Sequence, residues 1–224
     1  RRTVPLRCLA GEVLGAPLAA QGEIHVPDAP GAPPGTVAHV RVQALLQGVP
    51  LGPATVPHLH AGLRRIQAAF DLSGTADVRL DVDGPPATAR VDAHLDVRDA
   101  AASYVGETDP VTGARTGFPW RITDVAGTVD VAGSRVTFEA AGGHGDAAVQ
   151  VSGLVDDGPE GFPLTDVRVT GTDVPIDDDL RAGFRERAEA VLGRWQPAGT
   201  AARIEVRVEQ DPVVDRGGTA TQVV

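Results

Sequence analysis

The stretch Val174 to Val208 reads VPIDDDLRAGFRERAEAVLGRWQPAGTAARIEVRV. Its opening Val174-Pro175 is an extended dipeptide, because the residue before a proline disfavours the helical conformation. Three aspartates follow, and an aspartate is a favourable residue at the start of a helix. Apolar residues then recur at steps of three and four, which predicts a helix over about 178–194. Its apolar face consists of Leu180, Phe184, Ala188, Val191 and Trp195.

The end of this stretch changes its period. Pro197 prevents the helix from continuing. Apolar and charged residues then alternate from Ile204 to Glu209. An alternation of period two predicts a half-buried strand, here over 203–209.

The same arrangement occurs earlier in the chain. Val49-Pro50 precedes Val174-Pro175 by 125 positions, and Gly74-Thr75 precedes Gly199-Thr200 by the same distance. A helix is predicted over about 54–70, with an apolar face of Val56, Leu59, Leu63, Ile66 and Phe70. We therefore expect repeats of about 125 residues. Residues 1–83 would be a partial repeat, and 84–224 a second one containing a β-meander over 88–170.

Short alternating segments separated by turn residues fill the region between the two helices. Ala132-Gly133-Ser134 and Gly142 to Asp146 are typical hairpin turns. This pattern predicts a mainly β fold with two helices, built as an antiparallel meander. The strands would form a curved, open β-groove, and a closed β-sandwich is the alternative, because periodicity does not distinguish the two.

One side of these strands is aliphatic, and in an open sheet it would line an apolar path. The predicted lining consists of Val78, Leu80, Val82, Val91, Leu95, Val97, Val129, Val131, Val136, Phe138, Val149 and Val151. The predicted helical cover consists of Leu180, Phe184, Val191 and Trp195.

Composition excludes several classes of protein. The formal net charge of the 224 residues is −10, and a nucleic-acid partner requires a clustered positive patch instead. The single Cys8 excludes an internal disulfide framework, and we expect it to be a buried residue on a strand. No apolar run reaches the roughly 18 residues that a membrane-spanning helix needs. The chain lacks methionine, so we expect a segment of a longer protein.

Three clusters could hold a metal or a phosphate, and in each a structural role is the favoured interpretation. His58 and His60 lie at a helix start without a carboxylate or cysteine at a fitting spacing. The glycine-rich Gly142 to Asp146 precedes a strand, whereas a phosphate cradle precedes a helix. Asp177 to Asp179 are explained by helix capping, and no calcium-loop spacing follows them. No metal and no cofactor is therefore predicted.

No catalytic constellation is present in the sequence. Cys8 has no nearby base, and the G-x-S-x-G pattern of serine hydrolases does not occur. Phe118, Trp120 and Trp195 could contact a ligand, but large residues on an apolar face usually form a core. We therefore predict that the protein is not an enzyme.

The order of several phrases resembles the C-terminal β-repeat region of the AsmA-like family, the AsmA/TamB/YhdP group of envelope proteins. These phrases are I-T-D-V-A-G-T-V from Ile122 to Val129, the strand with Val136 and Phe138, Gly142-Gly143-x-Gly145, and A-V-Q-V-S-G from Ala148 to Gly153. The stretch from Leu95 to Tyr104 and the pair Phe118-Pro119 also match. The resemblance covers roughly residues 88 to 175.

This resemblance implies a repeated β-groove that carries phospholipid or another acyl lipid between membranes of the cell envelope. It also implies a periplasmic location, an inner-membrane anchor outside this chain, continuation into further repeats and no catalytic residues. The helix in each unit departs from that pattern. The alternative is a non-enzymatic surface or adhesion β-module.

Overall fold

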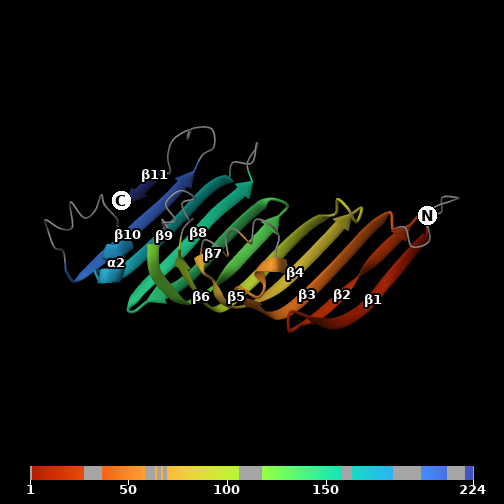
Figure 1. The fold of residues 1–224 in the computed structure, drawn as a ribbon, viewed down its shortest axis with the longest axis horizontal. Coiled ribbons are helices and arrows are strands. Elements are labelled where there is room, and N and C mark those ends of the chain that lie inside the picture. Colours follow the sequence, from red (N-terminus) through yellow and green to blue (C-terminus); the bar gives the residue numbers. More distant parts are fainter. Residues whose placement is uncertain are drawn as a thin grey trace.

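A computed structural model describes residues 2–27, 37–58, 64, 67, 70–105, 118–157, 163–183, 198–210 and 220–223. Its strands form one antiparallel sheet in which the spatial order equals the chain order, from β1 to β11 (Figure 1). The strands are β1 Arg2–Val13, β2 Ala16–Val26, β3 His39–Leu51, β4 Ser73–Gly84, β5 Arg90–Tyr104, β6 Phe118–Ala132, β7 Arg135–His144, β8 Ala147–Asp157, β9 Pro163–Pro175, β10 Thr200–Gln210 and β11 Ala220–Val223.

Among the described residues the sheet is open, since β1 and β11 lie at its two ends and pair there only with β2 and β10, respectively. The predicted antiparallel meander is confirmed. The described strands belong to a single sheet, which differs from the two packed sheets of the alternative sandwich.

Helical structure is sparse in the described residues. A 3-10 turn covers Val56–His58, the described residues Arg64, Gln67 and Phe70 are helical as predicted, and α2 covers Asp178–Gly183. Each lies in a connection that joins two neighbouring strands, β3 to β4 and β9 to β10. Of the first predicted helical face, Leu59, Leu63 and Ile66 lie outside the described residues, as do residues 184–197 of the second helix.

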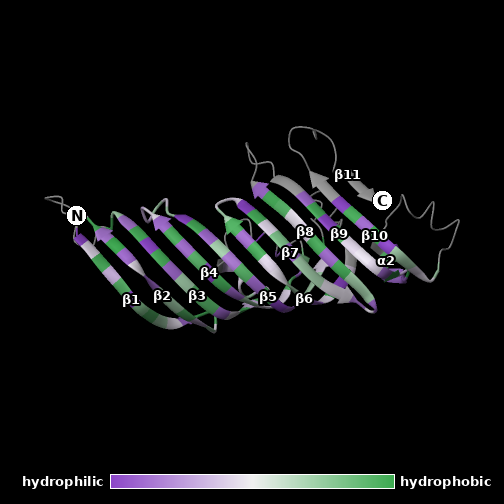
Figure 2. Cartoon of the chain, turned by 180° about the vertical axis from the view of Figure 1, so that it is seen from behind, coloured by the Kyte–Doolittle hydropathy of each residue, from purple (hydrophilic) through white to green (hydrophobic). Residues whose placement is uncertain are grey.

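Hydrophobic and hydrophilic residues alternate along the strands, as Figure 2 shows. Because successive side chains of a strand point to opposite sides, this alternation gives the sheet an apolar face and a polar face. Three buried clusters lie along the apolar face. They centre on Ala16 and Leu46, on Leu95 and Val136, and on Val149 with Leu180.

Several strands contain a residue with positive φ at a place where the pairing register shifts. Gly48 in β3, Asp99 in β5 and Asp124 in β6 have φ of 65°, 48° and 53°. The register shifts between Leu46 and Val49, between Val97 and Ala100 and between Thr123 and Ala126, respectively. These are β-bulges, which increase the local twist and interrupt the alternation of faces.

Candidate functional site

The predicted lining residues share one face of the sheet. Direct pairing joins Val78 to Leu95, Leu95 to Val129 and Val129 to Phe138. A parallel row runs from Leu80 through Ala93 and Val131 to Val136, again by direct pairing. Val82 pairs with Val91, and Val97 connects through Gly127 and Ala140 to Val151. Val149 pairs with Gly142, which lies two residues beyond Ala140 on the same face of β7.

The exposure of these residues differs along the sheet. Leu95, Val131, Val136 and Val149 are buried, and the last two expose only 1% of their surface. Val91 is exposed at 43%, while Val78, Leu80, Val82, Val97, Val129, Phe138 and Val151 are half-buried. The buried four are part of the protein's own core, so the contact surface for a ligand is smaller than the predicted lining.

The start of α2 covers part of the apolar face over β6 to β9. Leu180 is 4% exposed and packs in a cluster with Trp120, Val149 and Val174. The role of Leu180 as a cover over a lipid path stays a prediction. Phe184, Val191 and Trp195, the other predicted cover residues, lie outside the described residues.

A hydrogen-bonded group attaches α2 to the sheet. The Asp177 carboxylate accepts the backbone N–H of Leu180 at 2.7 Å and contacts His144 Nε2 at 3.2 Å. His144 Nδ1 lies 2.7 Å from the carbonyl oxygen of Arg121, and its ring lies 4.5 Å from the Trp120 ring. Both polar partners of the ring are oxygen atoms, and the tautomer decides which ring nitrogen is the donor.

Sequence reasoning assigned Asp177 to the helix start, and this is confirmed. It did not identify the contact with His144, since nothing in the spacing of 33 residues indicates it. Burial raises the pKa of Asp177, but the hydrogen bonds from Leu180 and His144 outweigh it and leave this pKa below its ordinary value.

The opposite face carries a ladder of charged side chains. His39 and Arg41 both contact Asp83, at 2.9 Å and 3.2 Å, and the hydrogen bond from His39 is the main cause that lowers the pKa of Asp83. At the other end of the sheet, Arg168 is the main cause that lowers the pKa of Glu205. These groups are solvent-accessible and belong to cross-strand pairs, so they stabilise a solvated face.

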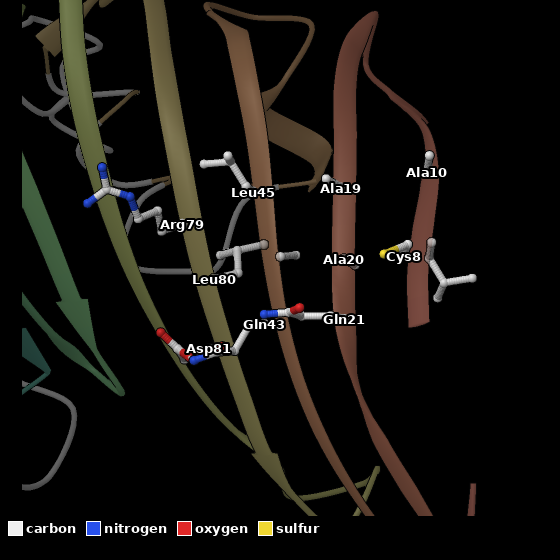
Figure 3. Close-up of a pocket in the computed structure, with 12 residues that line it drawn as sticks. Cys8, Ala10, Ala19, Ala20, Gln21, Gln43, Leu45, Arg79, Leu80 and Asp81 are labelled. Atoms are coloured by element: carbon white, nitrogen blue, oxygen red, sulfur yellow. The ribbon is translucent and has the colours of Figure 1, made fainter. Parts of the chain in front are cut away.

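Two shallow hollows occur over β1 to β4, with volumes of about 430 Å³ and 630 Å³. Figure 3 shows the smaller one, with Gln21, Gln43, Arg79 and Asp81 among its lining residues. Both linings are drawn mostly from rows of the polar face, with neighbouring residues of the apolar face between them. The lining of the larger hollow includes Leu6, Gly22, Val42 and Val82, which form a row of the apolar face.

The other sequence candidates have structural roles or fall outside the described residues. Gly145 has φ of 58° in the β7–β8 turn, as a hairpin requires, which agrees with the predicted turn. Cys8 lies on β1 but is exposed, so its predicted burial was wrong. The reason is that β1 is an edge strand, and Cys8 occupies the bulge between Leu6 and Leu9.

The metal candidates gain no support. Nothing is described of the His58 side chain, and His60 lies outside the described residues. Within the described parts of the chain, no group of three metal-ligating side chains is close enough to hold an ion. Among the same residues, no helix is long and apolar enough to cross a membrane.

Comparison with protein-family models, with curated proteins and with solved structures finds no match to this chain. The resemblance to the AsmA-like family therefore stays a prediction that depends on the quoted phrases.

Proposed function

We propose that the apolar face of this sheet binds acyl lipid, and that the protein acts as a non-enzymatic, AsmA-like carrier of phospholipid between membranes of the cell envelope. The observation that carries the proposal is the single open sheet with aliphatic rows on one face and charged rows on the other. Soluble proteins rarely leave a contiguous apolar surface without a partner.

The chemistry of the two faces favours lipid over a polar ligand. Charged residues of the central strands, such as Asp77, Arg79 and His94, lie on the polar face. Each forms an ion pair there with a residue of a neighbouring strand, namely Arg98, Asp96 and Asp130, respectively. The facing side chains on the apolar side are Val, Leu, Ala, Gly and Phe. Such a surface offers area for hydrocarbon and no side-chain hydrogen bond for a polar substrate.

A repeated unit is part of this proposal, because a groove between membranes must be longer than one sheet of this size. Gly48 and Asp173, which are 125 positions apart, both have positive φ directly before a Val-Pro pair. Val49 pairs with Ala76, and Val174 pairs with Ala201 at the same offset. We propose that these are equivalent junctions of two repeats of about 125 residues, the first partial over 1–83 and the second over 84–224.

The remaining parts of the proposal are a curved groove formed by the apolar face, a periplasmic location, and an inner-membrane anchor and further repeats outside this chain. The resemblance supports these parts, and the open ends of the sheet are compatible with added strands.

The experiment is lipid extraction from the purified protein followed by mass spectrometry. We expect acyl lipid in stoichiometric amount, and transfer of fluorescent phosphatidylcholine between two populations of vesicles. A matched β protein of similar size and charge, purified from the same cells, is the control. Protein that carries no more lipid than this control, and that does not accelerate transfer, would refute the proposed function.

Charge substitutions at Leu95 or Val149 are poor probes of this function. Both side chains are buried, so a charge there would destabilise the fold itself. Half-buried positions outside the core clusters are better probes, and the next section identifies them.

A further inference from the structure

The apolar face contains one row that no core cluster absorbs. The row contains one residue from each of the strands β1 to β5, and each residue pairs directly with the one on the next strand. We call these residues the open row: Leu6, Gly22, Val42, Val82 and Val91. Val4, Ile24 and Val40 flank it on the same face. None of these eight residues belongs to the three buried clusters or packs against them.

The open row ends at β5, because it has no apolar partner on β6. Asp92 of β5 pairs with Ala132, the last residue of β6. On the side that faces β6, Val91 therefore lies beside the β6–β7 turn and not beside an apolar strand residue. At the other end, Val4 exposes 39% of its surface on the edge strand. The row therefore crosses five strands and stops.

By contrast, the described chain itself covers part of the apolar face over β6 to β9. Trp120, Val149 and Val174 are each at most 5% exposed there, and Leu180 of α2 packs on them. Among the described residues, the exposed large apolar side chains all lie on β1 to β5, and β6 to β10 have none. The two halves of the apolar face thus differ in accessibility.

We propose that the open row is the acyl-chain binding site of this chain, and that the face over β6 to β9 is closed to lipid. This inference rests on the proposed function and adds a location to it. Val42 lies at the centre of the site, with two strands on each side, and Val82 is its neighbour on β4.

The dimensions of the row fit one acyl chain. Neighbouring strands lie about 4.8 Å apart, so four intervals give a length of roughly 19 Å. The hydrocarbon core of a bilayer is about 30 Å thick and holds two opposed chains, so each chain extends roughly 15 Å. Gly22 has no side chain, and a Cβ there would lie 2.1 Å from the carbonyl oxygen of Arg41.

The side chains of the row favour hydrocarbon over a protein partner. Protein interfaces are centred on aromatic or arginine anchors with a rim of hydrogen bonds. The open row and its flanking residues contain only Val, Leu, Ile and Gly. The backbone of β2 to β4 is hydrogen-bonded on both sides within the sheet, so it has little to offer a polar partner.

The test places a photo-crosslinking amino acid at single positions of the full-length protein. Val42 and Val82 probe the open row. Gln43 is the control for the opposite face of the same strand, and Val151 is the control for an apolar, half-buried position over the closed half. Each variant is irradiated with phosphatidylcholine vesicles that contain a traceable phosphatidylcholine.

We expect about tenfold more lipid label at Val42 and Val82 than at Gln43 and Val151. Equal or greater label at Val151 would overturn the inference but leave the proposed function intact. The same holds if lipid is extracted from the protein while Val42 and Val82 take no label. Crosslinked protein dimers at both positions, in place of lipid label, would identify a second copy as the occupant and overturn the inference. Absence of label at every position, together with absence of extracted lipid, would overturn both proposals.

Discussion

Asp77 of β4 and Asp96 of β5 are directly opposite each other in the sheet, and each carboxylate pairs with an arginine on the diagonal. Arg98 lies 2.9 Å from Asp77, and Arg79 lies 3.5 Å from Asp96. Two positive residues face each other in the same way on β9 and β10, namely Arg168 and Arg207. Arg168 pairs with Glu205, and Arg207 pairs with Asp166. These two parts of the polar face, on β4–β5 and on β9–β10, therefore separate like charges by the same diagonal arrangement.

Removal of one diagonal arginine should expose the repulsion between the facing aspartates. Arg98→Ala is expected to lower the free energy of unfolding by up to about 1 kcal/mol at low salt, because exposed ion pairs are weak and screened. The double variant Arg98→Ala with Asp77→Asn should recover most of this loss. Urea denaturation at low and high salt measures both. Arg135→Ala, on the same face of β7, is the control, and an equal loss there would contradict the explanation.

Gly153 should not tolerate a side chain. It pairs directly with Phe138, and a Cβ at this position would lie 2.6 Å from Phe138 Cζ and 2.8 Å from the Asp166 carbonyl oxygen. Gly153→Ala is therefore expected to cost about 1–3 kcal/mol of unfolding free energy through overpacking. Thermal or urea unfolding measures it. The exposed neighbour Ser152→Ala should change stability by less than about 0.5 kcal/mol, and a neutral Gly153→Ala would show that the ring moves freely.

Asp177 should stabilise the start of α2 through its cap. Asp177→Ala removes the acceptor of the Leu180 N–H and the partner of His144, with an expected loss of about 0.5–2 kcal/mol. Asp177→Asn keeps a cap acceptor and should lose less. Asp178→Ala is the control, since Asp178 is exposed and contacts Arg181 alone in the described residues. A larger effect of Asp178→Ala would contradict the assignment of the cap.

The pH dependence of the Asp177 contribution follows from the direction of its shift. Because the folded pKa of Asp177 is below its unfolded value, its contribution is present above the unfolded pKa. The contribution is lost as the pH falls through the folded pKa. The difference in stability between wild type and Asp177→Asn should therefore shrink in acid, which unfolding curves at a series of acidic pH values measure.

The pKa of His94 should lie above that of a free histidine. Its hydrogen bond to Asp130, at 2.6 Å, is the main cause that raises the pKa of His94. The stability that this pair contributes is present below the unfolded pKa of about 6.5 and is lost as the pH rises through the folded pKa. An NMR titration of the ring protons measures the midpoint. Asp130→Asn should lower it, and an unchanged midpoint would contradict the role of Asp130.

The sequence predicts the meander best where apolar and charged residues alternate without interruption. The β4 strand from Val78 to Asp83 and the turn at Gly133 are of this kind, and the structure confirms both. The aliphatic lining could be assigned to one face for the same reason. The burial of Val136 and Val149 could not, because it depends on what packs over the sheet from distant parts of the chain.

Bulges explain the parts of the fold that the pattern predicts poorly. Ile122 and Val125 are three residues apart but lie on the same face, because Asp124 adopts positive φ between them. In β1, the strand Arg2–Val13 continues across the bulge at Cys8, which also has positive φ. A non-glycine residue in this conformation has no reliable local signal. The open row was missed in part, since Leu6 and Val42 lie in such interrupted strands.

The order of the strands in this sheet has a kinetic consequence. Each of the described strands pairs only with strands adjacent to it in the chain, so each pairing closes a short segment. Short closures cost little chain entropy and favour fast formation of contacts. Folding can therefore begin at a tight hairpin, such as β6 with β7, and spread outward strand by strand in both directions. Loss of an end strand should then remove only the stabilisation from its pairing with one neighbouring strand, and the rest of the sheet should stay folded.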